Sequence, residues 1–294
     1  MQINLNTLRS IIFNNKSFFL GFIQMARLHT GMLAVSYLLL SKYLTDHQTR
    51  FMDSRVVMGG VVVISTVAFG FIVDDIRDLA TDRILKPNNA IPSGRVSHKS
   101  AILLAILFAV CSVFVASSLG GFFFVITLVN LLLCFSYAYL LRDSAVLSIF
   151  IMAYLSSSIV LFGSALAGGI RILTGSVFLL IFLFTCAQEI LYSVIDHDAD
   201  QMYSVRTPAT ILGINNSLML FVFFLLLTII VTLHLGIVSH ASSHFIILMI
   251  PCTILPLVSA IVVVTKSSSK NRLKSASKIL YITRVLSFIA LWSL

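Results

Sequence analysis

Long apolar stretches recur along this 294-residue chain. Each is about 20 residues long, enough for a helix to cross the hydrocarbon core of a bilayer. We place nine of them, at roughly 18–43, 56–73, 100–118, 120–141, 145–168, 172–194, 211–235, 245–265 and 277–294. Strands of a membrane β-barrel would instead alternate apolar and polar side chains, and these stretches do not. With 11% charged residues and a mean hydropathy of +1.03, the sequence predicts an all-α polytopic membrane protein.

The net charge of +9 is spread unevenly along the chain. If the N-terminus is cytoplasmic, the inside segments hold fourteen Lys and Arg residues, and the outside loops hold four: Lys42, Arg50, Arg55 and Arg171. This bias follows the positive-inside rule. Membrane topology therefore accounts for the basic charge, and we expect a lipid bilayer as partner and no nucleic acid. The first apolar stretch is long and contains Arg27, so we interpret it as a span and not as a signal peptide.

No soluble domain is expected, because the longest polar stretch covers only about residues 74–99. We therefore predict a single transmembrane domain over residues 1–294. The four cysteines lie in apolar stretches without CxxC spacing, and we interpret them as small buried hydrophobic residues.

Eight of the eleven acidic residues fall in two short clusters. The first acidic cluster consists of Asp74, Asp75, Asp78 and Asp82, and the second consists of Glu189, Asp196, Asp198 and Asp200. In the topology above, both lie on the cytoplasmic side, one after the second span and one after the sixth. So much negative charge at two places in so apolar a chain indicates sites for divalent cations.

The first acidic cluster has helical spacing. If the second span continues through it, Asp74, Asp78 and Asp82 follow i, i+4, i+8, and all four carboxylates fit within an arc of about 100°. Like charges at this spacing destabilise a helix, so a hard cation with oxygen ligands is expected to neutralise them. Pro87 and the turn at Pro92 end the helical pattern.

The residues of the second acidic cluster divide between two faces of the predicted helix. Glu189, Asp196 and Asp200 stand at i, i+7, i+11 on one side of a helix, and Asp198 points to the opposite side. Carboxylates near a membrane core are functional by default, because leaving them unpaired there costs several kcal/mol.

Two helix faces that carry carboxylates, with basic residues nearby, are suitable for binding a diphosphate. Mg²⁺ takes one or two carboxylates and completes its shell with water and substrate phosphates, and basic side chains neutralise the remaining oxygens. The competing interpretation is that the carboxylates pair with these basic residues and bind no metal.

At these motifs the chain resembles the UbiA superfamily of intramembrane prenyltransferases. The family's first motif, NDxxDxxxD followed by Lys and a Pro-Ser-Gly turn, is similar to DDIRDLATD at Asp74–Asp82, then Lys86 and PSGR at Pro92–Arg95. The second motif of its 4-hydroxybenzoate polyprenyltransferase type, DxxYAxxDxxxD, is similar to EILYSVIDHDAD at Glu189–Asp200, followed by ATILG at Ala209–Gly213. The resemblance covers essentially the whole chain.

The resemblance implies a helical bundle with a cytoplasmic N-terminus and an active-site cavity open at the cytoplasmic side. It also implies Mg²⁺-assisted ionisation of a prenyl diphosphate to an allyl cation, followed by attack of an acceptor, expected to be small and aromatic. The implied catalytic residues are Asp74, Asp78, Asp196 and Asp200. The implied metal ligands are Asp74, Asp75, Asp78, Asp82, Glu189, Asp196 and Asp200. The implied substrate-binding residues are Arg27, Lys86, Arg95, Tyr139, Arg142, Tyr192 and Arg206. The resemblance also suggests a bacterial inner membrane.

Several positions depart from the family pattern. Asp74 stands where Asn is usual, Glu189 replaces an Asp, and Asn89-Ala90 replaces a frequent Arg-Pro. Arg142 stands where relatives often carry Lys. These departures leave the metal chemistry in place and favour a member other than the housekeeping quinone enzymes.

The function predicted from sequence is Mg²⁺-dependent prenyl transfer. A membrane terpene cyclase of the same superfamily would share the ionisation step but use no acceptor. A secondary transporter would use the acidic residues as cation sites, although such sites usually lie near the bilayer midplane on broken helices.

Overall fold

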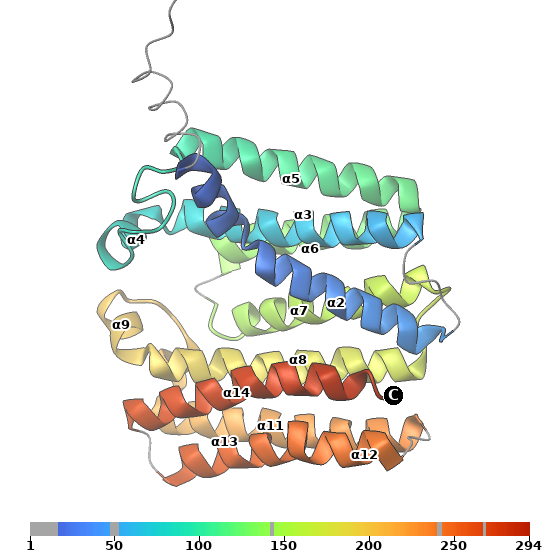
Figure 1. The fold of residues 1–294 in the computed structure, drawn as a ribbon. Coiled ribbons are helices and arrows are strands. Elements are labelled where there is room, and N and C mark those ends of the chain that lie inside the picture. The colour runs from blue at the N-terminus through green and yellow to red at the C-terminus, as the bar shows by residue number, and fades with distance from the viewer. Residues whose placement is uncertain (1–16, 48–52, 142–143, 240–242, 267–268) are drawn as a thin grey trace, which may run out of the picture. The chain divides into compact units, whose positions relative to one another are not determined.

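The computed structural model describes residues 17–47, 53–141, 144–239, 243–266 and 269–294, and these parts of the chain contain helices and no strand (Figure 1). They form two compact units. Unit 1 comprises Met1–Ser36 and Met52–Tyr139, and unit 2 comprises Tyr37–Phe51 and Leu140–Leu294. Helix α2 (Leu28–Thr45) contributes to both, because the boundary falls after Ser36. The single domain predicted from sequence stays a prediction.

Eight helices in the described residues are long and apolar enough to cross a membrane. They are Ser17–Thr45, Ser54–Arg77, His98–Leu119, Gly121–Leu141, Leu147–Leu166, Ile172–Ile195, Ile214–Val238 and Phe245–Lys266. The predicted all-α membrane fold is confirmed. The ninth predicted span lies in α14 (Lys270–Leu291), which is long enough but is not among the eight, because its first turns are rich in Lys and Arg.

Unit 1 is organised around α3 (Ser54–Arg77). This helix packs along α5 (His98–Leu119) and α6 (Gly121–Ser136). The Asp53 side chain caps the start of α3 by accepting from the Val56 N–H at 2.8 Å, and Ser97 caps α5 in the same way. Both caps satisfy backbone donors that a helix start leaves without partners.

A structured loop follows the short helix α4 (Leu79–Leu85) in unit 1. The loop is held down by its own apolar side chains, since Ala90, Ile91 and Val96 are buried with Ile72 of α3. Gly94 has a positive φ of 75°, which a glycine adopts without strain. The loop is therefore a fixed platform beside the end of α3 and not a loose connection.

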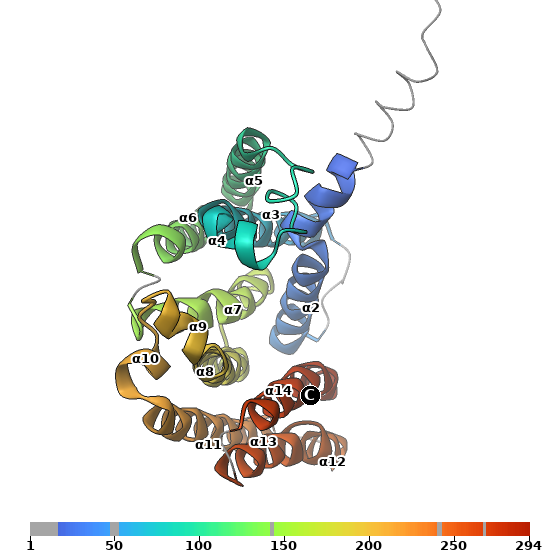
Figure 2. The same ribbon diagram turned by 90° about the vertical axis from the view of Figure 1, so that its left-hand side faces the viewer.

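Unit 2 is organised around α8 (Ile172–Ile195). Helix α8 packs against α7 (Leu147–Leu166), α11 (Ile214–Val238) and α14 (Figure 2). Helix α12 (Ser243–Met249), the π-helical turn η2 (Ile250–Ile254) and α13 (Leu255–Lys266) complete the unit. Because three helices cover α8, most of its side chains are buried.

Small and polar side chains join α2 to α7 inside unit 2. Ser41 donates to the carbonyl of Val160, and Thr45 shares a hydrogen bond of 2.8 Å with Ser164. Ser164 in turn hydrogen-bonds Thr174 of α8 at 2.9 Å. Such contacts are typical of membrane helices, where small residues allow close approach and polar groups find partners on a neighbouring helix.

A substitution at Gly163 would test how closely α2 and α7 approach each other. A Cβ at Gly163 would collide with the backbone carbonyl of Leu38, which has no rotamer to move into, whereas a Cβ at Gly175 of α8 would meet open space. We expect Gly163→Ala to lower the free energy of unfolding by about 1–3 kcal/mol. Gly175→Ala should be neutral or slightly stabilising, because Ala is the better helix former. Thermal unfolding in detergent measures both, and an equal midpoint for the two variants would contradict the tight packing.

Candidate active site

The first acidic cluster lies where α3 passes into α4. Helix α3 ends at Arg77, and Asp78 has φ −82° and ψ 2°, outside the helical range, before α4 begins at Leu79. The helix expected to continue through the cluster is therefore interrupted at Asp78. The Asp78 N–H still donates to the Asp74 carbonyl at 2.9 Å, and the Asp82 N–H to the Asp78 carbonyl at 2.8 Å. The interruption is local, and Asp74, Asp78 and Asp82 keep their spacing of about one turn.

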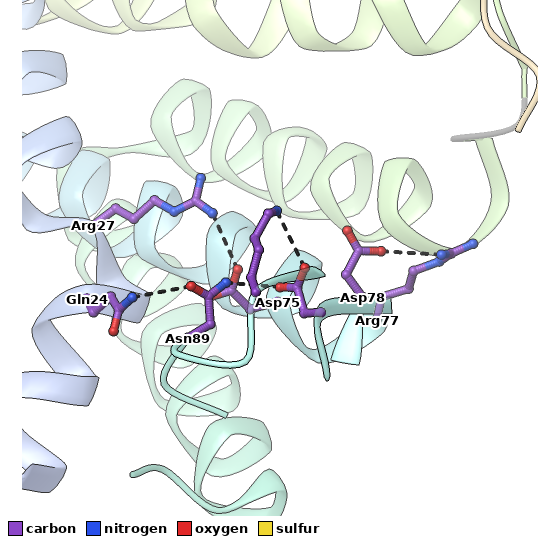
Figure 3. Close-up of polar contacts among 8 residues, drawn as sticks. Gln24, Arg27, Asp75, Arg77, Asp78 and Asn89 are labelled. Carbon is purple, nitrogen blue, oxygen red and sulfur yellow. Dashed lines mark hydrogen bonds and ion pairs between the residues drawn. The ribbon is translucent and has the colours of Figure 1, made fainter. Parts of the chain in front are cut away.

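Three of these carboxylates contact basic side chains. Arg27 lies 3.4 Å from Asp75 and Arg77 lies 3.3 Å from Asp78, and Figure 3 shows each arginine directed at its carboxylate. Asp82 lies 3.4 Å from Lys86. Pairing of carboxylates with basic residues, the competing interpretation of the motif, thus occurs for part of the cluster.

These pairs are weak. Their lengths exceed the 2.7–2.9 Å or so of a strong charged hydrogen bond. The basic partners are also well exposed, 38% for Arg27 and 63% for Lys86. Pairs of this kind typically contribute about 0–1 kcal/mol, so they leave the carboxylates able to bind a divalent cation.

Arg27 lies at a break in the first span. Residues 17–26 are helical, α2 begins at Leu28, and Arg27 between them has a positive φ of 42°. Its guanidinium lies 4.2 Å from the centre of the Phe71 ring as well as beside Asp75. The sequence identified Arg27 as a candidate, but the break was not predicted. A non-glycine residue in this left-handed conformation is strained, and such strain clusters at functional sites.

A polar network connects the loop to the first acidic cluster. Arg95 donates to the Gln24 side chain, to the Asn88 carbonyl and, at 3.0 Å, to Ser93 Oγ. Gln24 donates to Asn89 at 3.4 Å, and Asn89 donates to the buried Asp82 carboxylate at 3.1 Å (Figure 3). Gln24 and Asn89 were missed in the sequence, where Asn89 stood out only as a departure from Arg.

The second acidic cluster repeats the local geometry of the first. Helix α8 ends at Ile195, Asp196 has φ −94° and ψ 4°, and α9 (His197–Met202) follows at once. The Asp200 N–H donates to the Asp196 carbonyl at 2.9 Å. Asp196 is thus the counterpart of Asp78, each at the junction of a long helix and a short one with a second Asp four residues later. The two clusters therefore share one local arrangement.

Asp198 stands apart from its neighbours. Its side chain is 83% exposed and lies 3.9 Å from Lys270 and 3.5 Å from the ring of His197. This agrees with its expected position on the side of the helix opposite Asp196 and Asp200. Asp198 therefore serves as an internal control for the cluster.

The remaining predicted residues are spread over other elements. Tyr192 of α8 accepts from Gln188 at 2.8 Å, and Tyr139 lies in the π-helical turn η1 (Tyr137–Leu141) with 47% of its surface exposed. Arg206 is exposed in the segment after α9. Arg142 lies outside the described residues.

The donor set of both clusters consists of oxygen atoms, as Mg²⁺ prefers. Within the described residues, no three His, Cys, Asp or Glu side chains are grouped closely enough to hold a metal ion unaided. Mg²⁺ sites on phosphorylated substrates do not require such a cage, since one or two carboxylates with water and phosphate oxygens suffice. Asp78 with Asp82, and Asp196 with Asp200, meet that need.

The left-handed backbone conformation at Arg27 can be tested by substitution. Both Arg27→Ala and Arg27→Gly remove the ion pair with Asp75, but only the alanine must keep the strained left-handed conformation. We expect the glycine variant to be the more stable by about 1 kcal/mol, the reverse of the usual order in a helix. Thermal unfolding in detergent measures the difference, and a more stable alanine variant would show an ordinary helical backbone at this position.

Comparison with known proteins covers nearly the whole chain. A model of the UbiA prenyltransferase family matches residues 31–288. A digeranylgeranylglyceryl phosphate synthase from Methanococcus aeolicus is 28% identical over 236 residues, which cover 80% of this chain and 82% of that protein. The synthase from Saccharolobus solfataricus is 24% identical over 261 residues, 86% of this chain and 92% of that protein.

Solved structures share the fold. A structure of digeranylgeranylglyceryl phosphate synthase matches with a TM-score of 0.80 at 22% identity, covering 94% of this chain and 97% of that one. A UbiA homolog from Archaeoglobus fulgidus bound to GPP and Mg²⁺ matches with a TM-score of 0.65 at 18% identity, covering 92% and 99%.

Two expectations change with these relatives. They are digeranylgeranylglyceryl phosphate synthases and not the 4-hydroxybenzoate type that the second motif suggested. They come mainly from archaea, so the expected bacterial inner membrane has no support, whereas an integral multi-pass membrane protein does.

Proposed function

The chain belongs to the UbiA prenyltransferase family, and we propose that it transfers a C20 prenyl group from its diphosphate to a hydroxyl of a glyceryl phosphate acceptor. The observation that carries this proposal is the match to digeranylgeranylglyceryl phosphate synthases over most of both chains. The same match favours prenyl transfer over the two alternatives, a transporter and a terpene cyclase.

The aromatic acceptor expected from the motif resemblance is not supported by these relatives. The product in their name carries two geranylgeranyl groups on glyceryl phosphate. Formation of this product requires geranylgeranyl diphosphate as the donor of one group and an acceptor that already carries the other group. The acceptor is thus a phosphorylated lipid alcohol, and the new bond is an ether.

We propose Asp74, Asp78 and Asp82 in unit 1, and Asp196 and Asp200 in unit 2, as the residues that hold Mg²⁺. The bound metal would draw charge from the diphosphate and assist cleavage of the C–O bond. Asp75, also predicted as a ligand, lies beside Arg27, and we propose that this pair positions the cluster. We propose Glu189 of α8, the remaining predicted ligand, as a further candidate for the second metal site.

Basic residues around the clusters suit phosphate groups. We propose that Lys86 and Arg206, which are exposed, and Arg95 in its network with Gln24 bind phosphate oxygens of donor or acceptor. Arg27 and Arg142 are further candidates for the same task. Tyr139 and Tyr192 are proposed to line the path of the substrate.

The proposal is tested with purified protein, geranylgeranyl diphosphate and Mg²⁺, with either geranylgeranylglyceryl phosphate or 4-hydroxybenzoate as acceptor. We expect an ether product from the first acceptor only, and no product when EDTA removes the metal. Asp78→Asn and Asp196→Asn should each lower the rate at least about 100-fold, because each removes a ligand charge needed in the transition state. Product is measured by mass spectrometry and pyrophosphate release.

The matched control is Asp198→Asn in the second acidic cluster, which should keep the rate within about 2-fold, since Asp198 is exposed and lies apart from Asp196. Prenylation of 4-hydroxybenzoate in place of the glyceryl phosphate would overturn the proposed acceptor. Full activity of the Asp78→Asn and Asp196→Asn variants would overturn the proposed metal sites.

A further inference from the structure

The Asp82 carboxylate has a different partner at each of its two oxygens. Lys86 Nζ lies 3.4 Å from Oδ1, and the Asn89 side-chain N–H donates to Oδ2 at 3.1 Å. The Asp82 side chain is only 8% exposed, so little water reaches it. An ionised carboxylate offers about four acceptor sites, and these two contacts therefore leave Asp82 able to bind a metal ion as well.

Asn89 is itself held by a chain of hydrogen bonds. Its side-chain oxygen accepts from Gln24 at 3.4 Å, and the Gln24 side-chain oxygen accepts from the Arg95 guanidinium. Figure 3 shows Asn89 between Gln24 and the carboxylates. We call the chain of contacts that runs from Arg95 through the two amides to Asp82 the amide relay. It joins the helical residues 17–26 to the loop and the loop to α4.

The charged groups at the two ends of the amide relay fix its direction. A guanidinium only donates, so Gln24 must turn its oxygen toward Arg95. A carboxylate that binds a metal ion only accepts, so Asn89 must turn its nitrogen toward Asp82. The contact in the middle is then a donation from Gln24 to Asn89, as the structure has it. Any other orientation of either amide breaks a contact.

Close packing holds Gln24 beside the loop. Gly21 precedes Gln24 by about one helical turn. A Cβ at Gly21 would lie 2.9 Å from Val96 Cγ2 and 3.3 Å from Arg95 Cβ, and Val96 is fully buried. The helical residues 17–26 thus contact the loop directly within unit 1, which fixes Gln24 although its side chain is exposed.

We propose that Gln24 and Asn89 are positioning residues for the Mg²⁺ site in unit 1, which hold Asp82 in the orientation that binds the metal. This inference rests on the proposed function, in which Asp82 holds Mg²⁺. Hydrogen-bond partners of a metal-binding side chain orient it, and their loss typically lowers metal affinity about 10–100-fold. An amide orients a carboxylate without cancelling its charge, whereas a second cation beside Lys86 would compete with the metal.

Two other roles make different predictions. If the amide relay only ties the helical residues 17–26 to the loop, its loss should lower stability and leave the affinity for Mg²⁺ unchanged. If only the net charge near the first acidic cluster matters, Gln24→Glu should strengthen Mg²⁺ binding, because it adds a negative charge.

Gln24→Glu separates these roles because it reverses the amide relay. The introduced carboxylate accepts from Arg95 and also from Asn89, whose amide must turn to donate to it. The Asn89 oxygen then faces Asp82, which loses its donor. We expect the affinity for Mg²⁺ to fall about 10-fold. We expect no such fall when Asn89→Leu has already removed the amide, because residues that act through each other are not additive.

The experiment measures Mg²⁺ binding to the full chain in detergent, with geranylgeranyl diphosphate present and no acceptor. The readout is the rise of the unfolding midpoint with Mg²⁺ concentration in wild type, Gln24→Glu, Asn89→Leu and the double variant. Asn89→Leu should need at least about 10-fold more Mg²⁺ than wild type for half of the rise.

The matched control is Asn88→Leu, at the neighbouring asparagine of the same loop. Asn88 is exposed and gives its backbone carbonyl to Arg95, a contact that the substitution keeps. Its Mg²⁺ dependence should stay within about 2-fold of wild type. Gln24 is exposed as well, so Gln24→Glu keeps the fold and carries the test even where Asn89→Leu does not.

Prenyl transfer to geranylgeranylglyceryl phosphate gives a second readout. In Asn89→Leu the Mg²⁺ concentration for half of the maximal rate should rise by the same factor as in the binding experiment. The rate at saturating Mg²⁺ and the KM of the acceptor should stay within about 3-fold, because the variant keeps every proposed metal ligand. If wild type transfers no prenyl group but the pattern of midpoints holds, the proposed function fails and the role of Gln24 and Asn89 stands.

Three results would overturn the inference. Unchanged Mg²⁺ dependence of the midpoint in Asn89→Leu would identify a structural tie. Stronger Mg²⁺ binding by Gln24→Glu would show that net charge alone decides the affinity. An equal fall caused by Gln24→Glu with and without Asn89→Leu would show that the effect of Gln24 does not pass through Asn89.

Discussion

The most demanding constraint on this protein is the placement of negative charge on helices built for a lipid bilayer. A helix satisfies its backbone internally, which is why the described spans are helical, but a carboxylate on it must find a compensating charge or reach water. In both units the aspartates lie in or directly after the last turn of a long apolar helix, and Asp78 and Asp196 interrupt that helix. The interruption gives each cluster a short second helix, α4 or α9, that carries the next aspartate.

Packing within each unit holds these helix ends in place. In unit 1, the loop after α4 is anchored by buried Ile91 and Val96, and its polar network holds Asn89 against Asp82. In unit 2, α8 is enclosed by α7, α11 and α14, so the direction of its last turn is fixed. The close contact of Gly163 with Leu38 and the hydroxyl network around Ser164 fix α7 against α2. The carboxylates are therefore presented by rigid elements, as the proposed metal sites require.

Much of this could be predicted from sequence because its signals are local. Apolar length identifies the spans, and carboxylate spacing identifies both clusters and sets Asp198 apart. Other features depend on contacts between distant residues. Nothing near Arg284 in the sequence indicates that it donates to Thr185, 99 residues earlier, and nothing near Asn89 indicates Asp82 as its acceptor. The strained backbone of Arg27 was equally hidden, since the surrounding residues are ordinary helix formers. The motifs could not identify the acceptor, because an aromatic acceptor and a glyceryl phosphate acceptor would both react with a prenyl diphosphate donor.

The two arginines that lie within apolar stretches occupy comparable surroundings. Arg27 lies beside Asp75 and over the ring of Phe71, and Arg284 donates to Thr185 and lies near the ring of Phe184. In each case an arginine distant in sequence contacts the long helix that leads into an acidic cluster, α3 or α8. The aspartates with helical spacing, three in unit 1 and two in unit 2, are the residues that we propose hold a divalent cation. A division of tasks would account for clusters with more carboxylates than Mg²⁺ needs: in the function proposed above some of them bind the metal, whereas Asp75 pairs with Arg27.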